Sequence, residues 1–567
     1  MTLAPTLTRR PESSRLRLPL PLPMTGLLIL AAAYCLLGLM PHDPWKTEDA
    51  IGIGIVHRML ISGGLHAWLV PNLAGEPYLQ DGPLYYALAA FCAKVLSFAL
   101  ATHDGARLAS ALCIATTLWF LRAAGREFFS PVANDNDKGR TVEGDGAALI
   151  MIGTLGLFVH AHEVLAENGA LAGMALAWYG LARARGNAIR GGLWFGLGIA
   201  IALWTKGPTP AIPVIVAALA SPLLGSAWRT RAQVQFLAIS AAIVLVVAFG
   251  WYAALHAQNA ALPLAWWQTQ YDIFANPTWE RALEQLQLLS WATWPAWPLA
   301  AWALRERRHR LRNDAILPVA AAVALGLAMF LFTRDVNEVF AMPMMLPLAL
   351  AAGAGVPALR RGAANALGWF GAMTFTTGAI LVWLGWFAMM TGMPRQIALN
   401  FAKLEPGHVP QFGALAFAIA TALTLTWVFL LWRSERSLHR CTAFWAAGVV
   451  LVWGLATTLW LPWIDYGKTY RPVATSLASI LKSVNPGGAR CIASRGLGEA
   501  QRAAFDYHAA IATQRLEIHE RNGCTLLLIQ ARAGEASAPD QPGSGWRRVW
   551  EGNRPRDRER FRLYVRR

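Results

Sequence analysis

The sequence predicts a polytopic α-helical membrane protein with a small α/β domain at its C-terminal end. Of the 567 residues, 55% are hydrophobic and only 15% are charged, whereas soluble domains carry roughly 25% charged residues. The apolar residues fall into many separate runs, each near the length that crosses a hydrocarbon core of about 30 Å. These long runs stop at residue 463, and shorter segments with mixed periodicity follow.

The net charge of +17 raises nucleic acid as a partner, but the placement of the basic residues argues against it. They lie in short clusters between the apolar runs, as expected for cytoplasmic loops, which carry the Lys/Arg excess of membrane proteins. The clusters are at 9–17, 122–140, 183–190, 229–231, 305–312, 360–361 and 433–440. They serve as fixed points for the topology.

About thirteen transmembrane helices satisfy these fixed points. The expected spans are 24–40, 106–122, 147–163, 168–184, 190–205, 208–224, 235–254, 288–304, 315–333, 340–358, 367–390, 411–432 and 441–463. This count predicts a cytoplasmic basic tail (1–23), a transmembrane domain (24–463) and a periplasmic C-terminal domain (464–567). The location is the inner membrane of a bacterium, with the tail retained as an anchor.

The apolar stretch 83–101 is left out of the spans. We interpret it as an interfacial or re-entrant helix within the first outer loop, 41–105. The alternative is a fourteenth span, which would place every later basic cluster outside the cell, against the positive-inside rule.

The C-terminal region predicts an α/β domain. Helices are expected at 472–483 and 499–509, and strands near 491 and at 516–519, 525–530, 547–550 and 561–565. Cys491 and Cys524 each begin a predicted strand in an oxidising compartment, which favours a disulfide between them. The other four cysteines lie in or near apolar segments, as buried cysteines commonly do.

Two adjacent carboxylates, Glu48 and Asp49, follow the first span and precede an amphipathic helix expected at 50–62. A carboxylate at the membrane surface can serve as a general base for an acceptor hydroxyl. The alternative is helix capping, because acidic residues in a first turn interact favourably with the helix dipole.

The segment 45–86 resembles the first periplasmic loop of the aminoarabinose transferase family, which is related to the protein O-mannosyltransferases of the GT-C superfamily. The matching residues are Glu48, Asp49, Met59, Leu60, Gly63, Trp68, Val70, Pro71, Asn72 to Gly75, Tyr78 and Pro83-Leu84. The resemblance implies a GT-C fold and places Glu48 on the family's catalytic aspartate, with Asp49 as its neighbour and the alternative choice. The family lysine and first proline are replaced by Asp81 and Gly82, so Asp81 occupies the position that holds the donor phosphate in the family.

Three further residues match the family in the expected order. Glu167 falls on a second acidic position, and Lys206, within Leu203-Trp204-Thr205-Lys206-Gly207-Pro208, falls on a phosphate-binding lysine. Arg334 is a further candidate for the phosphate. The alternatives are a snorkelling lysine at a helix end for Lys206 and a simple ion pair with Asp335 for Arg334.

A metal site is the alternative interpretation of the second acidic region. His160, His162, Glu163 and Glu167 are ordinary ligand types, although their spacing lacks a closed four-ligand signature. A divalent metal therefore stays open as a cofactor.

The predicted function is transfer of a sugar from a polyprenyl-phosphate donor, most simply undecaprenyl phosphate, to lipid A, another envelope glycan or lipid, or a protein. Glu48 or Glu167 deprotonates the acceptor, and Lys206 and Arg334 neutralise the leaving phosphate. The sequence has no nucleotide-binding glycine loop, which agrees with a lipid-linked donor. Two alternatives stay open: a lipid or sugar transporter or flippase, and an envelope protein with a degenerate site.

The topology is testable by reporter fusions along the chain. Fusions after Arg140 and Arg310 should report the cytoplasm, and a fusion after Tyr466 should report the periplasm, because the basic clusters face inward. Alkaline phosphatase and green fluorescent protein activities distinguish the two sides. A fluorescent, phosphatase-negative fusion after Tyr466 would contradict the odd number of spans.

Overall fold

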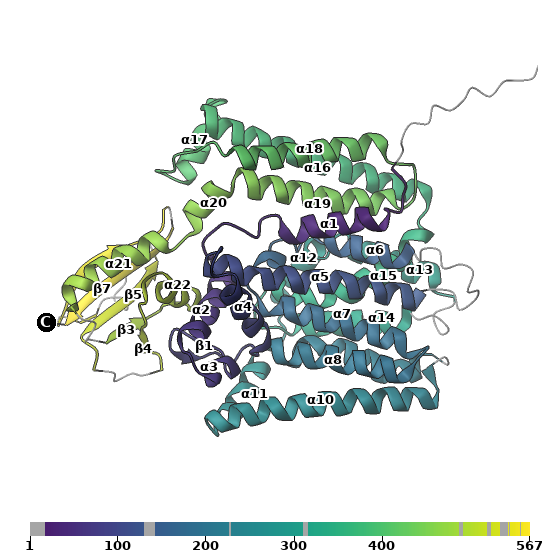
Figure 1. Cartoon of the computed structure of the whole chain (residues 1–567), viewed down its shortest axis with the longest axis horizontal. Coiled ribbons are helices and arrows are strands. Elements are labelled where there is room, and N and C mark those ends of the chain that lie inside the picture. The colour runs from purple at the N-terminus through teal and green to yellow at the C-terminus, as the bar shows by residue number, and fades with distance from the viewer. Residues whose placement is uncertain are drawn as a thin grey trace, which may run out of the picture.

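The computed structural model of the chain describes residues 18–129, 142–225, 228–309, 316–486, 491–518, 523–532, 542–543, 545–555 and 557–566. Most of the predicted cytoplasmic tail and the centre of the polar loop after 122 lie outside these ranges. The described part is a bundle of roughly aligned helices with a sheet domain at one end (Figure 1).

Seven helices within the described residues are long and apolar enough to cross a membrane. They are α5 (Thr102–Phe129), α8 (Ala188–Lys206), α10 (Arg231–Gln258), the stretch Glu338–Ala358 with α15 (Met342–Gly355) at its centre, α16 (Arg361–Thr391), α18 (Ala414–Arg433) and α19 (Arg440–Leu459). Shorter apolar helices are α1 (Met24–Leu36), α4 (Leu84–Val95), α9 (Ile212–Leu224) and α14 (Ile316–Leu331). The remaining bundle helices are α6 (Val142–Ile152), α7 (Ala166–Ala184), α12 (Trp279–Ala292) and α13 (Ala296–Arg307).

Each of the thirteen predicted spans contains helix, but at least three of them are interrupted, among them 441–463, which is divided between α19 and α20 (Leu461–Lys468) at Trp460. The span expected at 147–163 ends with α6 at Ile152, and turns lead to the short 3₁₀ helix η1 (His160–His162). The span expected at 288–304 is divided between α12 and α13 at Pro295, which has no N–H to continue a helix. Apolar composition gave the correct segments but could not locate these breaks.

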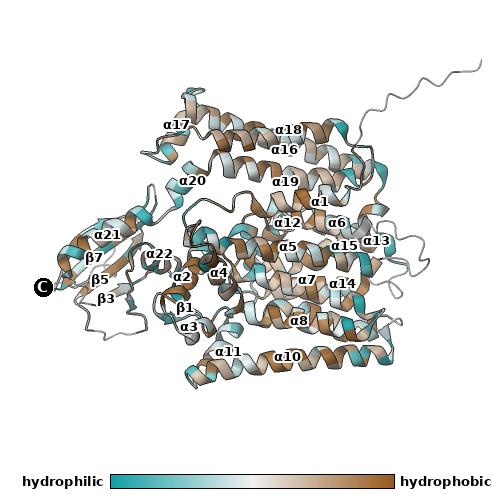
Figure 2. Cartoon of the chain, viewed as in Figure 1, coloured by the Kyte–Doolittle hydropathy of each residue, from teal (hydrophilic) through white to brown (hydrophobic). Residues whose placement is uncertain are grey.

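Helices at the edges of the bundle expose apolar side chains outward. Helices α10 and α18 lie at opposite edges, and both carry apolar residues along most of their length (Figure 2). Only Ala420 and Trp427 of α18 are buried within the protein. A helix whose backbone groups are satisfied internally and whose apolar side chains face outward is suited to lipid.

The segment expected to be interfacial forms α4, which has 12 residues. Its buried face packs against α2 (Glu48–Ile61) and α5, in a cluster that includes Ile53, Tyr85 and Ala109. Its position beside α2, at the end of the bundle that carries the sheet domain, agrees with the interfacial interpretation (Figure 1).

The two ends of the bundle differ in character. Helices α2, α3 (Leu65–Leu69), α4, α11 (Leu262–Asp272), α17 (Arg395–Leu404) and α20 (Leu461–Lys468) lie at the end that carries the sheet domain (Figure 1). Because α11 follows α10 and α17 follows α16, the arginine-bearing starts of α10 and α16 lie at the opposite end. The predicted outer loops and the predicted basic loops are therefore separated as the topology requires.

The C-terminal domain contains a five-stranded sheet in the order β4-β3-β5-β7-β6. The strands are β3 (Ile492–Arg495), β4 (Gln514–Arg515), β5 (Leu526–Arg532), β6 (Trp546–Gly552) and β7 (Glu559–Arg566). β4 and β5 pair with β3 in parallel, whereas β7 pairs with β5 and β6 in antiparallel register. Helices α21 (Arg471–Val484) and α22 (Glu499–Ala509) complete the domain, and Tyr470, Phe505 and Phe561 meet in its core.

Every predicted element of this domain is present, with one shift. The strand expected at 516–519 lies earlier, at Gln514–Arg515, because Ile518 already turns back to donate its N–H to the Arg515 carbonyl. Residue 519 lies outside the described residues.

The sheet domain docks onto the first outer loop through α22. The hairpin of β1 (Asn72–Leu73) and β2 (Glu76–Pro77) and helix α2 face it. A Cβ on Gly54 would lie 2.7 Å from the Ala503 side chain, so α2 and α22 approach closely.

Two ion pairs also join the sheet domain to this loop. Arg58 Nη2 lies 2.5 Å from Asp506 Oδ1, and Arg502 Nη2 lies 3.0 Å from Glu76 Oε1.

The disulfide predicted from the sequence is confirmed: Cys491 and Cys524 are joined, with their Cα atoms 5.1 Å apart. The bond links the segment before β3 to the segment before β5 and closes a loop of sequence separation 33.

Removal of this disulfide should destabilise the domain. The chain-entropy relation for a loop of this length gives roughly 3 to 4 kcal/mol of stabilisation. Non-reducing peptide mapping should find the two cysteines linked, and Cys491→Ser with Cys524→Ser should lower the unfolding temperature of the purified protein. Cys441→Ser is the control, because Cys441 is a free buried cysteine elsewhere. Free thiols at both positions in exported protein would contradict the prediction.

Candidate active site

Glu48 and Asp49 form the first turn of α2 but have different surroundings. Asp49 is buried: its carboxylate accepts hydrogen bonds from the backbone N–H groups of Val164 (2.9 Å) and Trp45 (3.3 Å). Arg107 of α5 lies 2.7 Å from it through Nη2. Burial alone would raise the pKa of Asp49, but the guanidinium of Arg107 outweighs it and holds the pKa below its usual value. Asp49 thus has the environment of a structural anion.

Arg107 itself is fully buried and uses all of its N–H donors. Besides Asp49, it donates to the carbonyls of His42 (2.7 Å) and Asp43 (3.1 Å) and to the carboxylate of Asp104 (3.2 Å). The guanidinium therefore fixes the chain between α1 and α2 against α5.

The Glu48 carboxylate is partly exposed and makes no hydrogen bond to any residue in the described ranges. Burial, followed by the nearby Glu167 carboxylate, raises the pKa of Glu48 to about 7, although Lys206 acts in the opposite direction. A carboxylate that is unpaired, reachable and near neutrality in its pKa has the properties of a general base.

Lys206 lies at the end of α8, between two carboxylates. Its Nζ is 2.6 Å from Asp81 Oδ1 and 2.7 Å from Glu167 Oε1. Asp81 precedes α4 and Glu167 lies in the first turn of α7, so three separate segments meet at this ammonium. The ammonium is held by fixed partners, in contrast to a lysine that snorkels to solvent.

The chain around Asp81 is fitted to the end of α8. Gly82 donates its N–H to the Thr205 carbonyl at 2.8 Å, and a Cβ at Gly82 would lie 2.2 Å from the Trp204 carbonyl oxygen. A proline here, as in the family pattern, would lack the N–H and collide with α8. The two departures from the family pattern, at 81 and 82, therefore belong to one local arrangement.

Arg334 lies apart from this cluster. It follows α14, its N–H donates to the Ile273 carbonyl at 2.8 Å, and its side chain is exposed. The ion pair with Asp335 that we expected as the alternative is not among the interactions of the described residues. The neighbouring residues Phe274 and Thr333 line the pocket described below.

The histidines near Glu167 have separate partners. His160 Nδ1 lies 2.7 Å from Glu163 Oε2, whereas both ring nitrogens of His162 lie 2.6 Å from the carbonyls of Phe158 and Tyr34. No three His, Cys, Asp or Glu side chains in the described part of the chain are arranged to hold a metal ion. The group His160, His162, Glu163 and Glu167 is therefore not assembled as a metal site in this structure.

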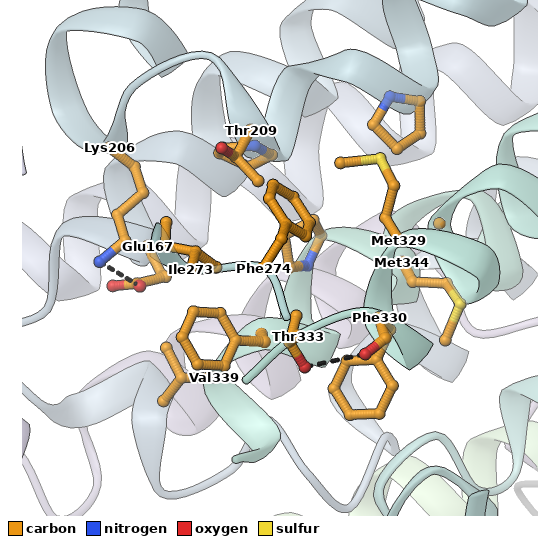
Figure 3. Close-up of a pocket in the computed structure, with 15 residues that line it drawn as sticks. Glu167, Lys206, Thr209, Ile273, Phe274, Met329, Phe330, Thr333, Val339 and Met344 are labelled. Carbon is orange, nitrogen blue, oxygen red and sulfur yellow. Dashed lines mark hydrogen bonds and ion pairs between the residues drawn. The ribbon is translucent and has the colours of Figure 1, made fainter. Parts of the chain in front are cut away.

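An apolar pocket opens beside Lys206 and Glu167 (Figure 3). These two residues lie at one side, and Phe274, Met329, Phe330 and Met344 continue away from them. Its walls come from α9, α14, α15 and the 273–274 segment, and its cavity volume is about 60 Å³. It has a charged end and an apolar remainder.

Comparisons with known proteins point in one direction. No family model matches the chain. The undecaprenyl phosphate-α-4-amino-4-deoxy-L-arabinose arabinosyl transferase of Pseudomonas aeruginosa (strain UCBPP-PA14) is 26% identical over 352 residues, which are 60% of this chain and 61% of that protein. An enzyme of the same description from Pseudomonas fluorescens is 25% identical over 58% of this chain and 56% of its own length. The chain thus matches less than two thirds of the length of these curated relatives.

Solved structures extend the comparison to nearly the whole chain. The crystal structure of ArnT from Cupriavidus metallidurans bound to undecaprenyl phosphate aligns over 95% of this chain and 97% of its own, with a TM-score of 0.65 and 14% identity. The chain has the ArnT fold. The apo structure of the same protein gives a TM-score of 0.62. The resemblance to the aminoarabinose transferases and the predicted fold class, with its C-terminal sheet domain, are confirmed.

Two contributors to the candidate site were missed in the sequence. Arg107 lies inside an apolar span, where a charge is costly and usually functional, and that signal was available. Tyr86 donates a hydrogen bond to Asp81 Oδ2 at 2.5 Å. No sequence signal marked it, because a tyrosine near the start of a helix is not specific to any one role.

Asp49 and Glu48 should respond differently to loss of charge. Asp49→Asn breaks a buried ion pair, which costs roughly 3 to 5 kcal/mol, so the detergent-purified protein should unfold at a clearly lower temperature. Glu48→Gln, on the adjacent residue, should change stability by no more than about 0.5 kcal/mol. Equal unfolding temperatures for the two variants would mean that Asp49 does not hold the loop.

Proposed function

We propose that the protein is an inner-membrane glycosyltransferase that transfers a sugar from an undecaprenyl-phosphate donor to an envelope acceptor on the periplasmic side. The observation that carries this proposal is the unpaired Glu48 carboxylate within electrostatic range of Glu167 and Lys206, the two charged residues that line one side of an apolar pocket, in a chain with the ArnT fold. The acceptor is lipid A, another glycan or lipid, or a protein.

The pocket suits a donor that is apolar at one end and anionic at the other. A polyprenyl chain would contact Phe274, Met329 and Phe330, and its phosphate would lie toward Lys206. A lysine ammonium is a common phosphate-binding group. Arg334, exposed beside the pocket, is the second cation proposed for the phosphate.

Glu48 is the proposed base. The acceptor hydroxyl attacks the anomeric carbon as its proton passes to the Glu48 carboxylate, and the bond from that carbon to the phosphate oxygen breaks. Undecaprenyl phosphate leaves with the electron pair, and Lys206 stabilises the charge that develops on it. Glu167, hydrogen-bonded to Lys206, orients the ammonium and serves as a second acidic contact for substrate.

We further propose an amino pentose as the sugar. The relatives from Pseudomonas are named for 4-amino-4-deoxy-L-arabinose. In this chain, Asp81 and Glu167 contact the Lys206 ammonium and Glu48 lies within electrostatic range of it, and the buried Glu167 Oε2 has no hydrogen-bond partner among the described residues. A protonated amine on the sugar would complement this excess of negative charge.

The basic clusters and the cysteines support the proposed orientation. The candidate site and the disulfide-bonded domain share one end of the bundle, and disulfides persist in oxidising compartments such as the periplasm. The arginine-rich loops at the other end suit the cytoplasmic face.

Loss of the proposed base should abolish most turnover in a purified assay with undecaprenyl-phosphate aminoarabinose and lipid A. Glu48→Gln keeps the size of the side chain but cannot accept a proton, so turnover should fall by roughly 10²- to 10⁴-fold. In the unsubstituted protein, kcat/KM should rise as pH increases through about 7, where Glu48 loses its proton. That rise should be absent from Glu48→Gln, and Lys206→Ala should weaken both donor binding and turnover.

Matched controls separate this role from helix capping. Glu280 lies in the first turn of α12, as Glu48 lies in that of α2, but it is exposed and outside the site. Glu280→Gln and Lys403→Ala, the latter in the last turn of α17, should retain full activity. Full activity of Glu48→Gln and Lys206→Ala with a verified donor would reject the proposed site.

A further inference from the structure

The Lys206 ammonium already has a full set of anionic neighbours before any ligand binds. Asp81 and Glu167 contact it at 2.6 and 2.7 Å, and only 17% of the Lys206 side chain is exposed. Two carboxylates beside one ammonium leave a local charge of about −1. A phosphate that approaches Lys206 must therefore also approach a carboxylate.

Asp81 is the more rigidly held of the two carboxylates. Its second oxygen accepts a hydrogen bond from the Tyr86 hydroxyl at 2.5 Å, and its side chain is 3% exposed. The next residue, Gly82, is tied to α8 through its N–H and has no room for a side chain. Asp81 thus cannot move away from Lys206 without breaking the hydrogen bond from Tyr86 or the bond from the Gly82 N–H to α8. Glu167, by contrast, has a buried Oε2 without a partner among the described residues.

The lipid donor and the lipid product of the proposed reaction carry different charges. A sugar-phosphate diester carries one negative charge, whereas the released monoester has a second ionisation near pH 6 and approaches two charges above it. A fixed negative charge beside the phosphate therefore repels the released monoester more strongly than the diester donor. At a separation of about 5 Å and an effective dielectric constant near 20, one additional unit of charge corresponds to a difference in affinity on the order of a few hundredfold.

We propose that Asp81 is a fixed counter-anion of Lys206 that discriminates between the diester donor and the monoester product, and so promotes release of undecaprenyl phosphate. This inference rests on the proposed function, because it assigns the lipid phosphate to Lys206. Asp81 acts here as a specificity-determining residue. This role gives a reason for an aspartate beside a phosphate-binding lysine: its charge disfavours the product more than the donor.

The test compares binding of two ligands at pH 8 to the full-length protein and to Asp81→Asn. The ligands are undecaprenyl phosphate and its methyl ester, a diester that cannot transfer a sugar. Asparagine keeps the shape of the side chain and can still bond Tyr86 and Lys206. In Asp81→Asn, affinity for the monoester should increase by roughly tenfold or more relative to the change for the diester. Undecaprenyl phosphate should also inhibit the Asp81→Asn variant at correspondingly lower concentrations than it inhibits the unsubstituted protein.

Asp145→Asn is the matched control, because Asp145 is also a buried aspartate in an ion pair, 2.5 Å from Arg122, but belongs to α6 outside the site. It should leave the ratio of the two affinities unchanged. Tyr86→Phe, which frees one side of Asp81 and keeps its charge, should change the ratio less than Asp81→Asn. Equal changes for both ligands, or weaker monoester binding in Asp81→Asn, would overturn the inference alone. Failure of the unsubstituted protein to bind either lipid would overturn the proposed function as well.

Discussion

The buried guanidinium of Arg107 is the interaction on which the arrangement of the candidate site and of the bundle end that carries the sheet domain depends. It lies within a helix of the bundle, and each of its donors is satisfied by the segment 42–49 or by Asp104 of its own helix. An unpaired charge at this depth would be costly, so the segment has to adopt the path that satisfies it. That path places Asp49 on Arg107 and leaves the adjacent Glu48, in the same first turn of α2, without a hydrogen-bond partner among the described residues.

The network extends from Arg107 to the C-terminal domain. Asp43, whose carbonyl accepts from Arg107, directs its carboxylate to Arg471 and Thr469. Asp465 of α20 accepts from the Asp43 N–H at 3.0 Å and from the Trp45 indole at 2.8 Å. The polypeptide between α1 and α2 is therefore the common partner of the bundle and of the segment that enters the sheet domain.

The sequence predicted those features that are encoded locally. Apolar runs, basic clusters and strand-like segments identified the helices, the division into bundle and outer domain, and the disulfide, because each depends on a stretch of neighbouring residues. The breaks near Ile152 and Pro295 were not found, since a short turn scarcely changes the apolar content of a run.

The sequence named the residues of the candidate site but could not give the pairings between them. The choice between Glu48 and Asp49 depends on Arg107, which is 58 residues from Asp49. The state of Lys206 depends on Asp81, which is 125 residues away. Neither pairing has a local pattern. The family pattern has a lysine at position 81, which is opposite in charge to Asp81. A family motif does not show the changes, such as Gly82, that accompany such a replacement in one chain.

The contacts of α2 also explain why the proposed base requires no movement of its helix. Asp49 holds the first turn through Arg107, and Arg58 holds the last turn through Asp506 of α22. Between them, Gly54 packs directly against Ala503, so that even one added carbon would force α2 and α22 apart. A helix fixed at both ends and in the middle cannot tilt without breaking a buried ion pair or a close contact, each of which is expensive. Glu48 is consequently preorganised before substrates arrive, and positioning of this kind lowers the barrier without reorganisation during the reaction. The C-terminal domain therefore helps to hold the helix that carries the proposed base, although none of its described residues lines the pocket beside Lys206.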